Sequence, residues 1–177
     1  GRFTGAMNLV KAGVGTLTLN NRSGTIPLGG DSDSSNTGST TINAGTLEVQ
    51  SGVDIGDTSV VTIDASASLN VNGTTNTETI GGLVGSGTVN IGTGNTLNVA
   101  NAAAASDTFA GVLAGGGGLT KAGASDSTLT LSGVYSSYVG NTTVSAGTLQ
   151  IGGSGTLKSG NFYAGDIAIA SGAVFQY

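Results

Sequence analysis

The chain has 177 residues, of which 33 are glycine and only 8% are charged, and it contains neither histidine nor cysteine. This composition excludes a histidine base, a thiolate nucleophile, a Cys/His zinc site and any disulfide. The net charge is -5, with five scattered cations and no basic patch, and the apolar runs are far shorter than the roughly 20 residues that span a bilayer. We expect no nucleic-acid partner and no membrane insertion by this segment. The hydrophobic content of 37% predicts a folded chain with a narrow core.

Short runs of alternating apolar and polar residues follow one another along the chain and predict half-buried strands. Helix signals are nearly absent, because the alanine run at 102–105 is too short to nucleate a helix alone. We therefore predict an all-β fold. The expected strands include residues 16–19, 46–49, 68–71, 96–99, 128–131 and 148–151.

These strands recur inside a longer unit. The stretch T-T-I-N-A-G-T-L-E-V at 40–49 returns as T-T-V-S-A-G-T-L-Q-I at 142–151, and L-V-K-A-G at the start of 9–19 is matched by L-T-K-A-G at the start of 119–131. Looser versions of the first stretch occupy 62–71 and 167–175. The leucines taken as equivalent are 20 to 32 residues apart and are Leu47, Leu69, Leu97, Leu129 and Leu149.

A repeat of two or three short strands cannot bury its own apolar side, whereas stacked copies can. Glycine suits the sharp corners, and threonine and valine suit stacked parallel strands. The repeat therefore predicts a parallel β-helix of about seven or eight rungs.

The rung pattern extends over the whole chain, so residues 1–177 are expected to form a single β-helical segment. Two stretches interrupt the alternation and are expected to be surface excursions, at 20–39 and at 72–79. The single proline, Pro27, falls in the first of them, where a strand hydrogen bond is not required.

The arrangement at 119–151 resembles the passenger-associated repeat of bacterial autotransporters. In that family a tyrosine and a glycine precede the T-T-V segment, and Tyr135, Tyr138 and Gly140 are the candidates here. The first copy has the 20–39 excursion in place of this element. The resemblance implies a right-handed β-helix that is exported by a Gram-negative bacterium to its surface or the extracellular space, and it implies no catalytic residues.

The acidic residues are the remaining candidates for chemistry. Asp31, Asp33 and Ser35 alternate as Ca²⁺ ligands do, but Asn36 and Ile42 occupy positions where an EF-hand needs glycine and glutamate, so a solvated turn is favoured.

A second acidic group consists of Asp54, Asp57 and Asp64, which are close enough in sequence to suggest the carboxylate pair of a glycoside hydrolase. The chain has no tryptophan and few cations to bind a sugar. We therefore predict no catalytic, metal or cofactor-binding residue, no cofactor and no enzyme activity.

The aromatic residues of the last third are expected to fill the core and stack between rungs, with a surface strip for a partner as the alternative. Because neighbouring strand residues face opposite ways, one member of the Phe162–Tyr163 pair is expected to point outward. Lys11 and Lys121, each in K-A-G, and the glycines at 115–118 are expected to mark turns. The aromatic residues concerned are Tyr135, Tyr138, Phe162, Tyr163, Phe175 and Tyr177.

The leading functional hypothesis is a non-enzymatic structural segment of an extracellular surface protein, a β-helical stalk or fibre with an adhesion or biofilm-matrix role and with host or matrix surfaces as partners. The first alternative is a filament subunit that stacks end to end on copies of itself, because the strand pattern reaches Tyr177 without a polar capping repeat. The second alternative is a β-helix that binds or degrades polysaccharide, which rests on fold analogy.

Overall fold

The computed structural model describes residues 5–19, 37–50, 55–73, 75–133, 137–157 and 162–177. Every regular element in these ranges is a β-strand, and every strand pairing is parallel. The strands form three sheets, which we call faces I, II and III. The described part of the chain contains no helix that could span a membrane.

Face I has eight strands, and its spatial order follows the chain. They are β1 (Leu9–Lys11), β3 (Thr40–Ile42), β5 (Val60–Ile63), β8 (Gly82–Gly85), β11 (Ser106–Phe109), β14 (Thr128–Leu131), β17 (Thr148–Ile151) and β19 (Val174–Gln176).

Faces II and III have six and five strands. Face II contains β2 (Thr16–Leu19), β4 (Gly45–Val49), β6 (Ala67–Val71), β9 (Thr88–Ile91), β12 (Val112–Gly115) and β15 (Ser137–Tyr138). Face III contains β7 (Thr77–Ile80), β10 (Thr96–Asn101), β13 (Gly118–Gly123), β16 (Thr142–Val144) and β18 (Ile167–Ile169).

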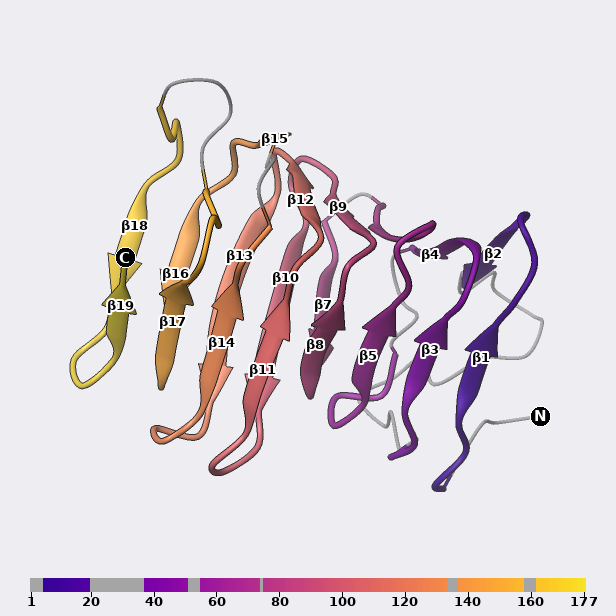
Figure 1. Ribbon diagram of the computed structural model, residues 1–177, viewed down its shortest axis with the longest axis horizontal. Helices are drawn as coiled ribbons and strands as arrows, with labels where there is room; N and C mark the ends of the chain where they lie inside the picture. Colours follow the sequence, from indigo (N-terminus) through magenta and orange to yellow (C-terminus); the bar gives the residue numbers. More distant parts are fainter. Residues whose placement is uncertain (1–4, 20–36, 51–54, 74, 134–136, 158–161) are drawn as a thin grey trace.

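The chain visits the three faces in turn, which makes the molecule a parallel β-helix, as expected. From β5 to β16 the order I, II, III repeats without interruption. Successive strands of each face stack along the long axis, and β1 and β19 lie at opposite ends of the resulting rod (Figure 1). The eight strands of face I agree with the expected number of rungs.

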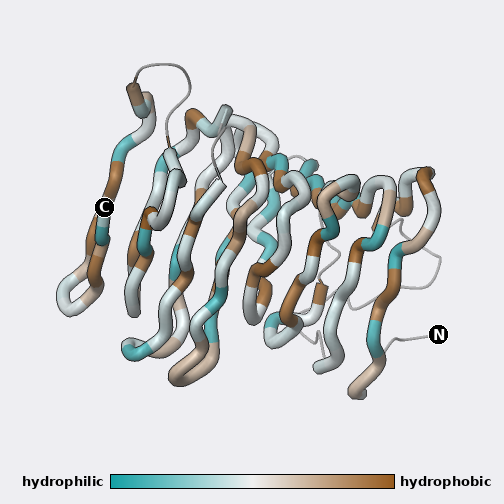
Figure 2. The backbone as a smooth tube through the Cα atoms, viewed as in Figure 1, coloured by the Kyte–Doolittle hydropathy of each residue, from teal (hydrophilic) through white to brown (hydrophobic). Residues whose placement is uncertain are grey.

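The core is the narrow space between the faces, and the alternation of the sequence fills it. In most strands every second side chain is buried, as in Thr128–Leu131 and Thr148–Ile151. Figure 2 shows this as hydrophobic and hydrophilic residues alternating along the tube. Equivalent positions stack across rungs into columns. One column has Gly85 between Ile63 and Phe109, and all its other members are buried, namely Ile42, Ile63, Phe109, Leu131 and Ile151.

The expected equivalence of the five leucines is wrong. Leu47 pairs with Leu69 on face II, and Leu129 pairs with Leu149 on face I, but Leu97 lies on face III. The mistake has a physical cause: all three faces carry the same alternation, so the local pattern does not reveal to which face a strand belongs.

The second expected excursion, 72–79, is too long. Residues 77–79 belong to β7, because Glu78 and Ile80 point into the core and the outward Thr77 and Thr79 complete the alternation. Most of the first excursion, residues 20–36 with Pro27, lies outside the described residues, while Thr40–Ile42 just beyond it is a regular strand of face I.

Corners between faces bring the backbones of successive rungs into close contact. Between faces I and II, a Cβ at Gly133 would overlap the carbonyl oxygen of Gly111, and a Cβ at Gly111 would overlap that of Gly87. These glycines therefore form a stack in which a side chain has no room. A second stack, between faces II and III, contains Gly117, Gly140 and Gly165.

Candidate functional site

The two repeat-equivalent lysines lie inside the rod. Lys11, in β1, has 6% of its surface exposed, and its Nζ donates to the carbonyl oxygens of Gly13 at 2.8 Å and Ala44 at 2.9 Å. Gly13 belongs to the corner that follows Lys11, and Ala44 belongs to the corner of the next rung along the rod. The ammonium group therefore joins two successive rungs.

Lys121, in β13, makes the same connection and is completely buried. Its Nζ donates to the Ala122 carbonyl oxygen at 2.6 Å, to Ser127 Oγ at 2.8 Å and to the Ala146 carbonyl oxygen at 3.3 Å. Ala44 and Ala146 are the alanines of the two A-G corners in the repeat. The lysine and the A-G corner of the next rung thus form one contact between rungs. The sequence predicts that the lysines mark turns, but both lie in strands, Lys11 at the end of β1 and Lys121 within β13, and their ammonium groups bond to the turns.

The surroundings of Lys121 include a carboxylate that the sequence reasoning missed. Asp107 takes an inward position in face I, where its register partner is Leu129, and it accepts hydrogen bonds from Leu83 N at 3.1 Å and Asn101 Nδ2 at 2.7 Å. Burial raises the pKa of Asp107, and burial lowers the pKa of Lys121, although each partly offsets the shift of the other.

One signal in the sequence could have revealed this carboxylate. In S-D-T-F, at 106–109, the aspartate stands two residues before the buried Phe109, where the alternation calls for an apolar side chain. The glycine at position 82 leaves room for it, because a Cβ there would overlap Asp107 Oδ2.

Charge is segregated between interior and exterior in the described part of the chain. Its two cations, Lys11 and Lys121, are both buried. The charged residues at its surface are all acidic. Glu48 and Asp107 are partly exposed, and the others are exposed, namely Asp57, Asp64, Asp126 and Asp166. The described exterior is therefore negatively charged.

The tyrosine element expected from the family pattern is present at Tyr138 and Gly140, whereas Tyr135 lies outside the described residues. Tyr138 is completely buried, and its hydroxyl accepts from Leu119 N at 2.8 Å and donates to the Asn141 carbonyl oxygen. Burial raises the pKa of Tyr138, so its phenol stays protonated and able to donate. The hydrogen bonds of the Tyr138 hydroxyl therefore join the end of face II to the start of face III.

A second tyrosine repeats this arrangement on the next rung. Tyr163 stacks on Tyr138 with ring centroids 6.1 Å apart and an interplanar angle of 22°. Its hydroxyl lies 2.8 Å from Thr142 Oγ1 and donates to the carbonyl oxygen of Gly140. Its neighbour Phe162 is 72% exposed, so the expectation that one member of this pair points outward is confirmed. Tyr138 and Tyr163 thus stack between rungs as expected.

The candidate carboxylates are not brought together. Asp57 and Asp64 are both exposed and lie beyond opposite ends of β5. A four-residue strand separates its ends by roughly 13 Å at about 3.3 Å per residue, which is beyond the reach of a retaining or inverting carboxylate pair. Asp54, Asp31, Asp33 and Ser35 lie outside the described residues, and among the described ones no group of three or more acidic side chains could hold a metal ion.

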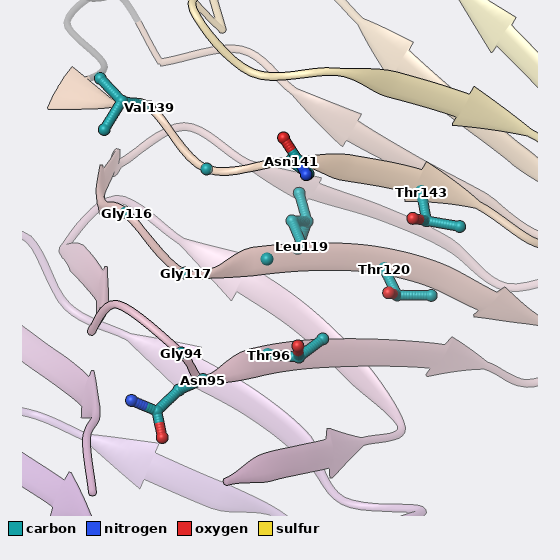
Figure 3. A pocket seen from close by; sticks show the side chains of 12 residues that line it. Gly94, Asn95, Thr96, Gly116, Gly117, Leu119, Thr120, Val139, Asn141 and Thr143 are labelled. Atoms are coloured by element: carbon teal, nitrogen blue, oxygen red, sulfur yellow. The ribbon is translucent and has the colours of Figure 1, made fainter. Parts of the chain in front are cut away.

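A groove with a volume of about 410 Å³ opens on the corner between faces II and III (Figure 3). It crosses three successive rungs and is lined by backbone and by small polar side chains, with no ionisable group among its lining residues. The glycine run 115–118 passes through it, with Gly116 and Gly117 forming the turn between β12 and β13. Such a lining offers hydrogen bonds but neither acid–base nor nucleophilic chemistry. The lining includes Thr96, Thr120, Val139, Asn141 and Thr143.

Comparison with known proteins gives two matches. The family model of the passenger-associated transport repeat matches residues 9–49 and 119–151, the two copies that contain Lys11 and Lys121. The chain is 40% identical over 160 residues to the adhesin BmaC autotransporter of Brucella suis biovar 1 (strain 1330), an alignment that covers 89% of this chain and 4% of that protein. No solved structure matches the chain. The resemblance to passenger repeats is confirmed, and the chain spans only a small part of the relative's length.

Proposed function

We propose that this segment, which carries two autotransporter passenger repeats, is a non-enzymatic stalk in the surface-exposed part of a Gram-negative adhesin. The observation that carries the proposal is the use made of the repeat residues. Lys11, Lys121 and Tyr138 are buried and bonded to the backbone of neighbouring rungs, and Gly140 is packed against the rung before it. The motif therefore builds and joins rungs, which is what a stalk requires.

The surface supports the same function. In the described part, the groove has no ionisable lining residue and the acids of the exterior do not cluster. The charges on the described part of the exterior are all negative, which disfavours polyanionic targets because like charges repel at contact. We infer that the adhesion target or matrix partner is a neutral or positively charged surface.

One deletion tests the stalk function in the parent protein displayed on cells. Removing residues 97–118 joins Thr96 to Leu119, the rung partner of Leu97, and so takes out one whole coil in register. The hydrogen bonds of the Lys121 ammonium all involve later residues and are retained. A stalk tolerates the loss, and we expect adhesion to be unchanged at equal surface display, measured with an antibody on intact cells.

Loss of adhesion at unchanged display would contradict the stalk function and place a binding site in the removed coil. Steady hydrolysis of any member of a polysaccharide panel by the purified segment would contradict the non-enzymatic assignment. The matched control for hydrolysis is the double variant Asp57→Asn/Asp64→Asn, which we expect to behave as the unchanged chain does. The right-handed sense of the coil is likewise our expectation, since parallel crossovers are nearly always right-handed, and an experimental structure checks it.

A second candidate function is end-to-end stacking into filaments, in which another copy of the segment would pair with β18. Ile167 and Ile169 continue inward columns, as register partners of Thr142 and Val144, yet they are 39% and 52% exposed. Open strand edges with apolar side chains invite another strand. We expect light scattering and electron microscopy of the purified segment to show association that increases with concentration.

The variant Ile169→Lys should abolish this association, because it puts a charge on the open edge. The control Val60→Lys changes an outward residue of β5 that is 40% exposed and lies away from both end rungs, and it should leave association intact. Monodisperse particles at all concentrations would contradict the filament function.

A further inference from the structure

The turn that follows β6 contains Asn72-Gly73, the single Asn-Gly dipeptide of the sequence. Both residues are exposed, and the backbone of Gly73 has a φ of 133°, a conformation that other residues rarely adopt. Asn72 itself is held in the rod, because its backbone N–H donates to the Val49 carbonyl oxygen at 2.8 Å. The dipeptide therefore combines a fixed asparagine with an accessible side chain.

The side chain of Asn72 is turned toward the nitrogen that follows it. Gly73 N donates to Asn72 Oδ1 at 3.1 Å. Because Oδ1 is bonded to Cγ, this contact also holds the nitrogen close to the carbonyl carbon. Gly92, on the next rung, lies beside the same oxygen: a Cβ there would come within 3.0 Å of Oδ1. Because Gly92 has no Cβ, the neighbouring rung leaves room for the side chain in this orientation.

We propose that Asn72 is a site of spontaneous modification, converted to isoaspartate and aspartate through a cyclic imide. Gly73 N loses its proton to solvent base and attacks Asn72 Cγ, so that an N–C bond forms. The Cγ–Nδ2 bond breaks, and Nδ2 takes up a proton and leaves as ammonia. Water then adds to one of the two carbonyl carbons of the imide and opens the ring, which gives aspartate or isoaspartate. The net reaction consumes one water and releases one ammonia, and nothing is oxidised or reduced.

Two other exposed asparagines provide internal comparisons. Asn43 is followed by Ala44, and Asn141 is followed by Thr142, whose side chains crowd the attacking nitrogen. Asn141 Oδ1 also accepts from Asp166 N at 3.0 Å, a contact with the next rung that turns its carbonyl group away from its own chain neighbour. Neither has the arrangement seen at Asn72.

The modification has two consequences for the rod. It adds a negative charge to an exterior whose described charges are already all acidic. Isoaspartate also adds a methylene to the backbone at the corner between β6 and β7, where Asn95 Nδ2 lies 3.4 Å from the Gly73 carbonyl oxygen. We expect this corner to loosen as the protein ages.

The test is incubation of the purified chain at 37 °C in H₂¹⁸O, at mildly acidic and mildly alkaline pH, followed by peptide mass spectrometry. We expect ¹⁸O-labelled isoaspartate and aspartate at position 72, formed faster at the higher pH and at least about tenfold faster than at Asn43 or Asn141, since glycine has no Cβ to block the attack. The variant Asn72→Gln should remove the labelled product.

Two results would overturn the proposal. The first is a rate at Asn72 no higher than at Asn43 and Asn141 in the folded chain. The second is a rate in the folded chain that is well below the rate in urea, because the fold would then protect the dipeptide instead of positioning it. The variant Ala44→Gly sharpens the test by creating an Asn-Gly pair at 43–44, and we expect it to react more slowly than the native pair in the folded chain.

Discussion

The two passenger repeats have nearly the same sequence but lie on different faces of the rod. In the first repeat the T-T-I strand is β3 on face I and its corner leads to β4 on face II. In the second repeat the T-T-V strand is β16 on face III and its corner leads to β17 on face I. The repeat therefore specifies a strand, a corner and a strand, and at least two of the three edges of the rod accept it.

The comparison also shows what the two copies keep in common. Each buries its lysine and bonds Nζ to the alanine carbonyl oxygen of the next A-G corner. Each corner needs glycine at Gly45 or Gly147, where φ is 69° and 70° and the neighbouring rung leaves no space for a side chain. The second copy adds the Tyr138 element, and its lysine lies near Asp107 on the preceding rung.

The largest effect is expected for Tyr138→Ala, which empties the buried ring position that distinguishes the second repeat. The variant should lower the free energy of unfolding by about 3 to 5 kcal/mol, as other buried aromatic truncations do. Urea unfolding followed by circular dichroism measures it. The control is Phe162→Ala, which removes a ring that is 72% exposed and should cost less than about 0.5 kcal/mol. If the two variants lowered the free energy of unfolding by similar amounts, burial of the tyrosine ring would not be the source of its contribution to stability.

The next effect is expected for Gly133→Ala, in the glycine stack of the corner between faces I and II. The new Cβ would overlap the backbone of Gly111, which cannot move without shifting its whole rung. We therefore expect the free energy of unfolding to fall by about 3 kcal/mol. Gly15 near the first repeat is the matched control, because a Cβ there meets nothing within 4 Å and its φ is not positive. A loss at Gly15→Ala as large as at Gly133→Ala would contradict the close-packing explanation.

A smaller effect is expected for the lysines, and it should differ between the repeats. Lys121→Met leaves the oxygens of Ala122, Ser127 and Ala146 without this donor inside the core. We expect the free energy of unfolding to fall by about 2 kcal/mol. Lys11→Met should cost less, because Lys11 retains some exposure and water can reach its carbonyl partners. Thermal and urea unfolding of the two variants provide the comparison. Equal losses would show that burial does not set the strength of this contact.

The smallest effect is the pH dependence contributed by Asp107. Burial raises its pKa in the folded chain, so the folded state binds this proton more tightly than the unfolded state does. Its contribution to the free energy of unfolding is therefore complete below about pH 4 and is lost as the pH rises through the raised pKa. This decrease in the free energy of unfolding with rising pH should be absent in the variant Asp107→Asn. An unchanged pH profile in that variant would assign the pH dependence to other groups.

Much of the fold could be predicted because it depends on local alternation. Residues 46–49 and 128–131 are strands, as expected. The Tyr138–Gly140 element is instead predicted by the resemblance to the passenger-associated repeat, in which a tyrosine and a glycine precede T-T-V. Residues 77–79 were missed because Glu78, a charged residue, is buried on the inward side, where its carboxylate accepts from Ile55 N. Alternation alone does not anticipate a buried acid whose partner lies on another rung.

The sequence by itself determined that the chain is a stack of short strands and sharp corners with few reactive or ionisable side chains. It could do so because alternation and corner residues act over a few neighbours. Only the tertiary structure decided on which face each strand lies, that both lysines of the described part point inward, and that the partly exposed Asp107 lies near Lys121. These features depend on contacts between rungs, about 20 or more residues apart in the chain, which form only when the coils stack in register.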